Sequence, residues 1–110
     1  NPTSMKLSIQ SFMKLKEVKK TLILGDMHEI GKTYLIEHER ILNSVKNNED
    51  LKIFLVGKIF NKLKFNSRRI HFFNETNELI EYFKKNLITG HTILLKGSRK
   101  INLEKVIPIL

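Results

Sequence analysis

Hydrophobic residues divide the chain into two alternating kinds of segment. Short apolar runs rich in branched side chains predict buried strands at residues 21–24, 51–56, 69–73 and 92–95. Segments in which apolar residues recur every three or four positions predict helices at residues 3–15, 33–47 and 76–87. Residues 58–68 allow one short helix, and Leu103, Val106 and Ile107 mark a last one. The apolar face of the helix at 76–87 extends to Leu87.

Strands that alternate with helices predict an α/β fold. Parallel strands joined by right-handed helical crossovers form one open sheet with helices on both faces. We therefore expect a Rossmann-like, three-layer α/β/α arrangement with a mostly parallel sheet, formed as a single domain of 110 residues. Ligands bind such sheets beyond the carboxyl ends of the strands. The loops at residues 25–31, 57–58, 74 and 96–99 are therefore the candidates for function.

The composition excludes several classes of protein. Hydrophobic residues make up 41% and charged residues 28%, the balance of an ordinary globular chain. The absence of cysteine excludes disulfides and thiolate metal sites. The apolar runs are far shorter than the roughly 20 residues of a spanning helix, and the first residues lack the apolar stretch of a secretory signal. We expect a cytoplasmic protein without a membrane segment.

The formal net charge of +9 at first suggests a polyanionic partner. Of the 20 basic residues 16 are lysine, and isoleucine and asparagine are also abundant, a joint bias that indicates codon drift rather than selection for phosphate contacts. Residues 51–74 are the exception, because they hold six lysines or arginines and no acid. We favour a solvated basic surface there. The alternative is a stand-alone nucleotide- or nucleic-acid-binding α/β module that uses residues 52–69.

The loop after the first strand nearly matches a phosphate-binding loop. Gly25 is followed by five residues and then by Gly31-Lys32-Thr33, whereas a P-loop has four residues at this point. Asp26 and Glu29 would also place two carboxylates where phosphates should lie. Together with His28 they form only a weak metal site. We interpret His38, on the apolar face of the next helix, as a core histidine.

Lys96-Gly97-Ser98-Arg99 is the more specific feature of the chain. A strand leads through glycine into a predicted helix, whose first N–H groups would attract an anion. Arg99 adds a planar fork suited to a carboxylate or phosphate, and Lys96 adds a point charge. A plain turn with two solvated cations remains the alternative.

Four segments, taken in order and spacing, resemble a known family. They are Asn-Pro-Thr-Ser-Met at residues 1–5, Leu-Gly-Asp-Met-His-Glu-Ile-Gly at 24–31, His38, and Leu-Lys-Gly-Ser-Arg at 95–99. Together they resemble the C-terminal domain of the Mur ligases, over essentially the whole chain. The second and fourth segments are specific for the member that adds D-alanyl-D-alanine to UDP-N-acetylmuramoyl-tripeptide. Ile30 departs from the usual leucine.

The resemblance implies an ATP-dependent, amide-forming ligase of peptidoglycan synthesis, of which residues 1–110 are the last domain. ATP and Mg would be bound mainly by a central domain outside this chain, and the UDP-sugar by an N-terminal domain. In this family ATP phosphorylates the terminal carboxylate of the tripeptide and leaves as ADP. The amine of the dipeptide then attacks the acyl phosphate, so that an amide bond forms and phosphate leaves. We expect residues 1–110 alone to be inactive and to hold no catalytic residue or metal ligand. We also expect a monomer whose partners are its own central domain and its substrates, with no nucleic acid and no membrane.

The resemblance also implies which residues meet the dipeptide. D-alanyl-D-alanine is a zwitterion, so its site needs a cation and an acceptor. The expected dipeptide-binding residues are Asp26, Met27, Glu29, Lys96, Ser98 and Arg99. Asn1 is expected near the nucleotide at the domain interface. Glu29 could instead cap its own loop.

Overall fold

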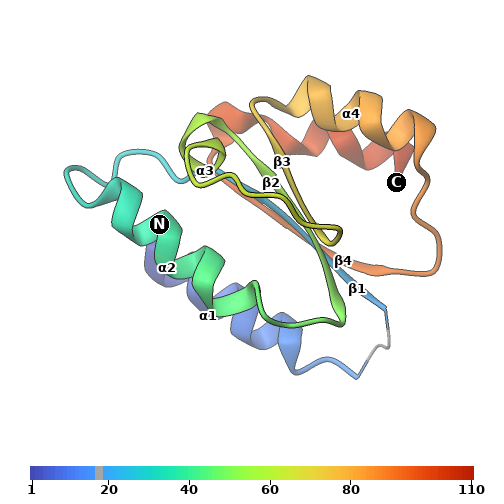
Figure 1. Cartoon of the computed structure of the whole chain (residues 1–110), viewed down its shortest axis with the longest axis horizontal. Helices are drawn as coiled ribbons and strands as arrows, with labels where there is room; N and C mark the ends of the chain where they lie inside the picture. The colour runs from blue at the N-terminus through green and yellow to red at the C-terminus, as the bar shows by residue number, and fades with distance from the viewer. Residues whose placement is uncertain (17–18) are drawn as a thin grey trace.

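The computed structural model describes residues 1–16 and 19–110, and a parallel sheet lies at its centre (Figure 1). Its strands are β1 (Lys20–Gly25), β2 (Leu51–Val56), β3 (Ile70–Phe73) and β4 (Thr92–Lys96). They lie in the order β3-β2-β1-β4, and every neighbouring pair is parallel. All four predicted strands are thus confirmed, to within one residue at each end.

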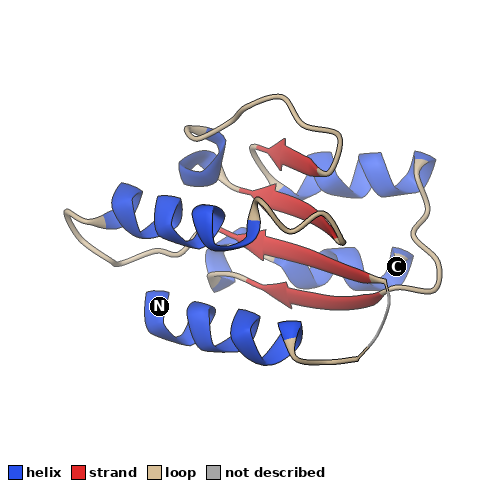
Figure 2. Cartoon of the chain, turned by 60° about the horizontal axis from the view of Figure 1, so that its bottom comes forward, coloured by secondary structure: helices blue, strands red, loops and turns tan. Residues whose placement is uncertain are grey.

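Helices cover both faces of this sheet, as Figure 2 shows. The first face carries α1 (Pro2–Met13), α2 (Tyr34–Val45) and α3 (Lys58–Asn61). The second face carries α4 (Thr76–Lys85) and the 3₁₀ segment η2 (Leu103–Ile109), which follows η1 (Arg99–Ile101). The predicted three-layer α/β architecture is therefore confirmed.

The apolar runs of the strands follow from this arrangement. Leu22 and Leu24 of β1 pack against the layer of α1 and α2, whereas Ile23 between them packs against the layer of α4 and η2. Successive side chains of a strand point to opposite faces. Because both faces are covered, each strand reads as a continuous hydrophobic run rather than an alternating one.

Local signals fix the helix beginnings. The Asn1 side-chain oxygen accepts a hydrogen bond from the Ser4 backbone N–H at 2.7 Å, and Pro2 occupies the first helical position, where its missing N–H costs nothing. In α4, Glu78 lies in the first turn and Lys84 and Lys85 in the last, which complements the helix dipole.

Two expectations about helices were wrong. The predicted helix at 76–87 ends at Lys85, and Leu87 is 75% exposed instead of lying on the buried face. The last predicted helix is 3₁₀ rather than α: Leu103 and Val106 are buried at the spacing of three that 3₁₀ geometry favours, whereas Ile107 is 57% exposed. Pro108 within this segment has no N–H to continue an α-helical ladder.

Within the described residues, none of the helices combines the length and hydrophobicity that crossing a membrane would require.

Candidate functional site

Four loops converge on a small cavity beyond the carboxyl ends of the strands. The cavity has a volume of about 300 Å³. Its lining residues are Asp26, His28, Lys58, Ile59, Asn74, Glu75, Thr76, Lys100 and Ile101. They come from the loops that follow β1, β2, β3 and β4, the same four loops that the predicted topology singled out. We call this the strand-end cavity.

Asp26 joins the first of these loops to the second. Its side chain is only 2% exposed, and both carboxylate oxygens accept backbone hydrogen bonds, Oδ2 from Ile59 at 2.8 Å and Oδ1 from Phe60 at 3.0 Å. These N–H groups belong to the first turn of α3, which has no helical partner for them. The carboxylate therefore caps α3 with charge-assisted hydrogen bonds, and it fixes the position of the loop that follows β2.

His38 supports the same loop through a hydrogen bond with its backbone. Its Nε2 accepts a hydrogen bond from the Met27 backbone N–H at 2.9 Å, so the proton lies on Nδ1, which donates to the Tyr34 carbonyl at 2.6 Å. Burial lowers the pKa of His38, against the smaller opposing effects of the Tyr34 carbonyl and the Asp26 carboxylate 3.9 Å away. The ring is neutral and fully buried, which confirms the interpretation of His38 as a core histidine.

The fourth loop is fastened directly to the first. The Ser98 backbone N–H donates to the Asp26 carbonyl at 2.9 Å, and the Ser98 hydroxyl lies 3.0 Å from His28 Nδ1. Gly97 makes this approach possible, because a β-carbon there would come within 2.7 Å of the Gly25 Cα. Loops separated by some seventy positions in the sequence thus form one rigid rim.

The six residues expected to bind the dipeptide are placed very differently. Asp26 lines the strand-end cavity, but its oxygens already bind backbone N–H groups. Met27 is 3% exposed and belongs to the core beside α1 and α2. Glu29 is exposed and has a left-handed backbone, with φ of 61°.

The remaining expected residues lie in or beside the fourth loop. Lys96 is half-buried at the end of β4, Ser98 is hydrogen-bonded to His28, and Arg99 is exposed at the start of η1. Asn1, expected near a nucleotide, uses its side-chain oxygen to cap α1.

Besides Asp26, the charged residues that line the cavity are Lys58, Glu75 and Lys100. Sequence reasoning indicated Lys58 only as part of the 57–58 loop, and it missed Glu75 and Lys100. Glu75 directly follows Asn74 at the end of β3, so the rule that ligands bind at strand ends could have indicated it as well. Lys100 had no comparable signal, because it lies in the short η1 turn beyond the predicted 96–99 loop.

The predicted helix N-terminus after Ser98 is wrong. Arg99–Ile101 forms a single 3₁₀ turn of three residues, too short for an aligned row of peptide dipoles. The Ser98 hydroxyl accepts one of its free N–H groups, from Lys100 at 3.4 Å. An anion near this loop would therefore be attracted mainly by lysine and arginine side chains.

The described residues do not fit Mg-ATP. Among them there is no group of three or more histidine, aspartate or glutamate side chains that could hold a metal ion. In the loop that resembles a P-loop, the Asp26 carboxylate turns inward to α3.

Arg69, part of the basic stretch 51–74, has a structural role. Its Nη1 donates to the carbonyls of Asn48 at 2.7 Å and Leu51 at 3.1 Å, and its Nη2 donates to the carbonyl of Lys46 at 3.0 Å. The guanidinium thus ties the end of α2 to the start of β2. These contacts use donors that phosphate binding would need and weaken the nucleic-acid alternative.

Relatives of known type match this chain along its length. The family model described as Mur ligase, glutamate ligase domain, matches residues 1–99. The UDP-N-acetylmuramoyl-tripeptide--D-alanyl-D-alanine ligase of Bacillus subtilis is 32% identical over 114 residues, which cover 97% of this chain and 25% of that protein. The protein of the same name from Buchnera aphidicola subsp. Acyrthosiphon pisum is 36% identical over 92 residues, covering 80% and 20% respectively.

Solved structures share the fold. MurF from Acinetobacter baumannii matches with a TM-score of 0.76 and 24% identity over 98% of this chain and 24% of that one. MurF ligase from Thermotoga maritima in complex with ADP matches with a TM-score of 0.76 and 20% identity over 99% and 25%. The chain spans about a quarter of the length of the curated relatives it matches. Because the family model covers residues 1–99, the chain belongs to the Mur ligase family and corresponds to its glutamate ligase domain.

Proposed function

We propose that this chain is the substrate-presenting domain of a ligase that adds D-alanyl-D-alanine to UDP-N-acetylmuramoyl-tripeptide. The observation that carries the proposal is the strand-end cavity, where Lys58, Lys100 and Glu75 from three separate loops line one space. The names of the two ligases described above, from Bacillus subtilis and Buchnera aphidicola, support this substrate pair over the nucleic-acid alternative.

The lining of the cavity suits a zwitterion. The dipeptide carboxylate would meet Lys58 and Lys100, with Arg99 next to Lys100 supplying a bidentate fork. The dipeptide ammonium would meet Glu75, and Glu29 is a second exposed carboxylate in the first loop. Asp26 and Ser98 would act as positioning residues, because their polar atoms hold the loops together. The domain would contribute to the rate mainly by holding the amine in line for attack.

The rest of the reaction belongs, in this proposal, to parts of the enzyme outside this chain. A central domain would bind ATP and Mg and form the acyl phosphate of the tripeptide, and an N-terminal domain would hold the UDP-sugar. Residues 1–110 would be the C-terminal domain of a monomeric cytoplasmic enzyme and would be inactive alone.

Titration of the isotopically labelled chain tests the proposal directly. D-alanyl-D-alanine should shift the amide signals of Lys58, Glu75, Lys100 and their neighbours, with weak affinity because only part of the full site is present. ATP with magnesium should show at most millimolar affinity, about −4 kcal/mol. Acetate serves as the control for a bare carboxylate. Dipeptide shifts confined to other surfaces, or shifts no different from those with acetate, would refute the assignment.

A further inference from the structure

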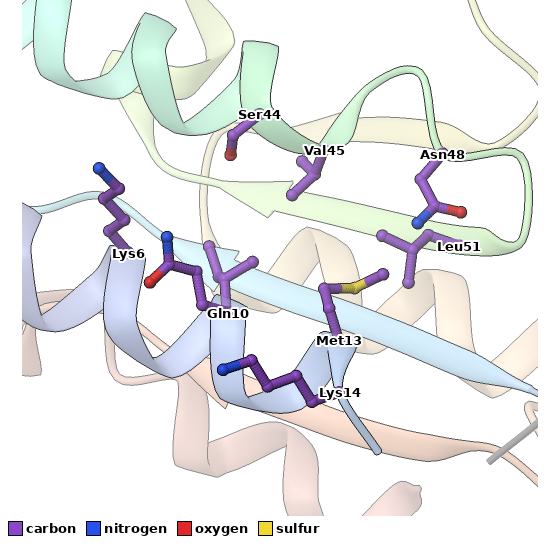
Figure 3. Close-up of a pocket in the computed structure, with 9 residues that line it drawn as sticks. Lys6, Gln10, Met13, Lys14, Ser44, Val45, Asn48 and Leu51 are labelled. Carbon is purple, nitrogen blue, oxygen red and sulfur yellow. The ribbon is translucent and has the colours of Figure 1, made fainter. Parts of the chain in front are cut away.

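A second and larger cavity lies between α1 and α2, away from the strand-end cavity (Figure 3). Its volume is about 580 Å³, within the range of roughly 300–1,000 Å³ typical of small-molecule sites. The residues that line it are Lys6, Ile9, Gln10, Met13, Lys14, Ser44, Val45, Asn48 and Leu51. None of them also lines the strand-end cavity. We call it the helix groove.

The helix groove is apolar at its base and polar along its walls. Ile9, Val45 and Leu51 are at most 4% exposed and continue into the core, and Met13 packs beside them. The α1 wall carries Lys6, Gln10 and Lys14 at intervals of four residues, which places them in one row along the helix. Ser44 and Asn48 form the opposite wall, as Figure 3 shows.

The charge that the described residues give to the groove has one sign. Among those residues, the lining includes two lysines and neither aspartate nor glutamate. A neighbouring cavity of about 460 Å³ shares Lys6 and Ser44 with the helix groove and continues it toward Pro2. The acid in that extension, Glu37, is paired with Arg40 at 2.6 Å, so it does not neutralise the lysines.

We propose that the helix groove binds a small amphipathic carboxylate with an unbranched aliphatic chain. The chain would lie on Ile9, Met13 and Val45, where burial of apolar surface provides the driving force. The carboxylate would lie against the Lys6–Gln10–Lys14 row, where two ammonium groups and an amide N–H can donate to it. The site is separate from the proposed dipeptide site, so it does not depend on the proposed function.

The test uses decanoate, below its micelle concentration, as the probe with the isotopically labelled chain. We expect saturable shifts confined to residues 6–14 and 44–51. The double variant Lys6→Glu/Lys14→Glu should weaken decanoate binding about tenfold, because both cations of the site are reversed. The matched control, Lys84→Glu/Lys85→Glu on α4, changes the net charge equally on the opposite face and should bind decanoate as the parent does.

Three further ligands and a second variant keep the result decisive. Decanol lacks the charge and acetate lacks the chain, so both should bind much more weakly than decanoate. D-Alanyl-D-alanine should leave the groove signals unchanged. Ser44→Phe should block the groove while thermal unfolding stays cooperative. Equal binding of decanol, an equal effect of the two charge reversals, or shifts spread over the whole surface would overturn the proposal.

Discussion

A β-carbon on Gly57 would lie 2.2 Å from the Cγ of Asp26, well inside any real carbon–carbon contact. Gly57 also has φ of 129°, a region that side chains rarely adopt. The glycine at the end of β2 therefore leaves the space that the Asp26 carboxylate fills when it caps α3. The first two loops of the strand-end cavity are built around this one contact.

Gly57→Ala should therefore destabilise the domain by about 2–3 kcal/mol, since it adds backbone strain to a clash with a buried, hydrogen-bonded carboxylate. Urea unfolding followed by circular dichroism measures this change. Gly90→Ala is the matched control, because Gly90 has φ of 72° but, apart from its chain neighbours, no atom of the described residues lies within 4 Å of its would-be β-carbon. It should cost only about 1 kcal/mol. Equal costs for the two variants would contradict the steric explanation.

Asp26→Asn should cost about 2–3 kcal/mol, because the amide can accept from only one of the two α3 N–H groups and turns its own donors toward the other. The amide signals of Ile59 and Phe60 should move upfield and lose hydrogen-exchange protection. Asp50→Asn, at an exposed position before β2, should change the free energy of unfolding by no more than about 0.5 kcal/mol. Unchanged protection at Ile59 would show that Asp26 does not cap α3.

Stability should fall as the pH decreases from neutrality. Burial lowers the pKa of His38 in the folded protein, and it also lowers the pKa values of His71 and His91. Below about pH 6.5 the unfolded chain therefore binds protons that the folded chain does not. The fully buried His38 then destabilises the fold by up to about 1.4 kcal/mol per pH unit, until the pH reaches its folded pKa. His71 and His91 contribute less, because they are only partly buried and solvent screens their charge.

Urea unfolding at several pH values between about 7.5 and about 5 measures how the free energy of unfolding changes with pH. His38→Gln should reduce the slope, because it removes a proton site that only the unfolded chain can use. A parent slope that His38→Gln leaves unaltered would show that protonation of this ring does not limit stability.

In the complete ligase proposed above, Arg99→Lys should raise the KM for D-alanyl-D-alanine and leave those for ATP and UDP-tripeptide nearly unchanged. Lysine keeps the charge but loses the planar fork, and one charge-assisted hydrogen bond is worth roughly 1.5–3 kcal/mol, or about ten- to a hundredfold in kcat/KM for the dipeptide. Lys100→Ala should affect the same constant, since Lys100 lines the cavity. If Arg99→Ala weakened only ATP binding, the loop would belong to the nucleotide or to the domain interface.

Charge reversal at Lys62 and Lys64 should leave turnover of the complete ligase within about twofold. Both residues are exposed, and the Lys62 ammonium lies 3.2 Å from the Tyr34 hydroxyl on the surface of α2. Steady-state kinetics at two salt concentrations measures the effect. A tenfold loss would mean that this basic surface takes part in domain closure or substrate capture.

The sequence by itself determined the layers and most of the elements. Strands covered on both faces must be continuously apolar, and helices covered on one face must be amphipathic. Local periodicity therefore predicted the succession of strands and helices along the chain. It also identified His38, because a histidine on an apolar helix face has to be buried. The helix ends and the 3₁₀ character of residues 103–109 were harder to predict from the sequence, because they depend on the surroundings of a few residues such as Leu87 and Pro108.

Only the tertiary structure decided what the functional loops do. Asp26 looks like a ligand in sequence, yet its partners Ile59 and Phe60 lie 33 and 34 positions away and reach it only because β1 and β2 are neighbours in the sheet. The same sheet order brings Lys58, Glu75 and Lys100 around one cavity. Periodicity records which side of an element is buried, whereas the distance between loops is set by strand order and by close contacts such as Gly97 against Gly25.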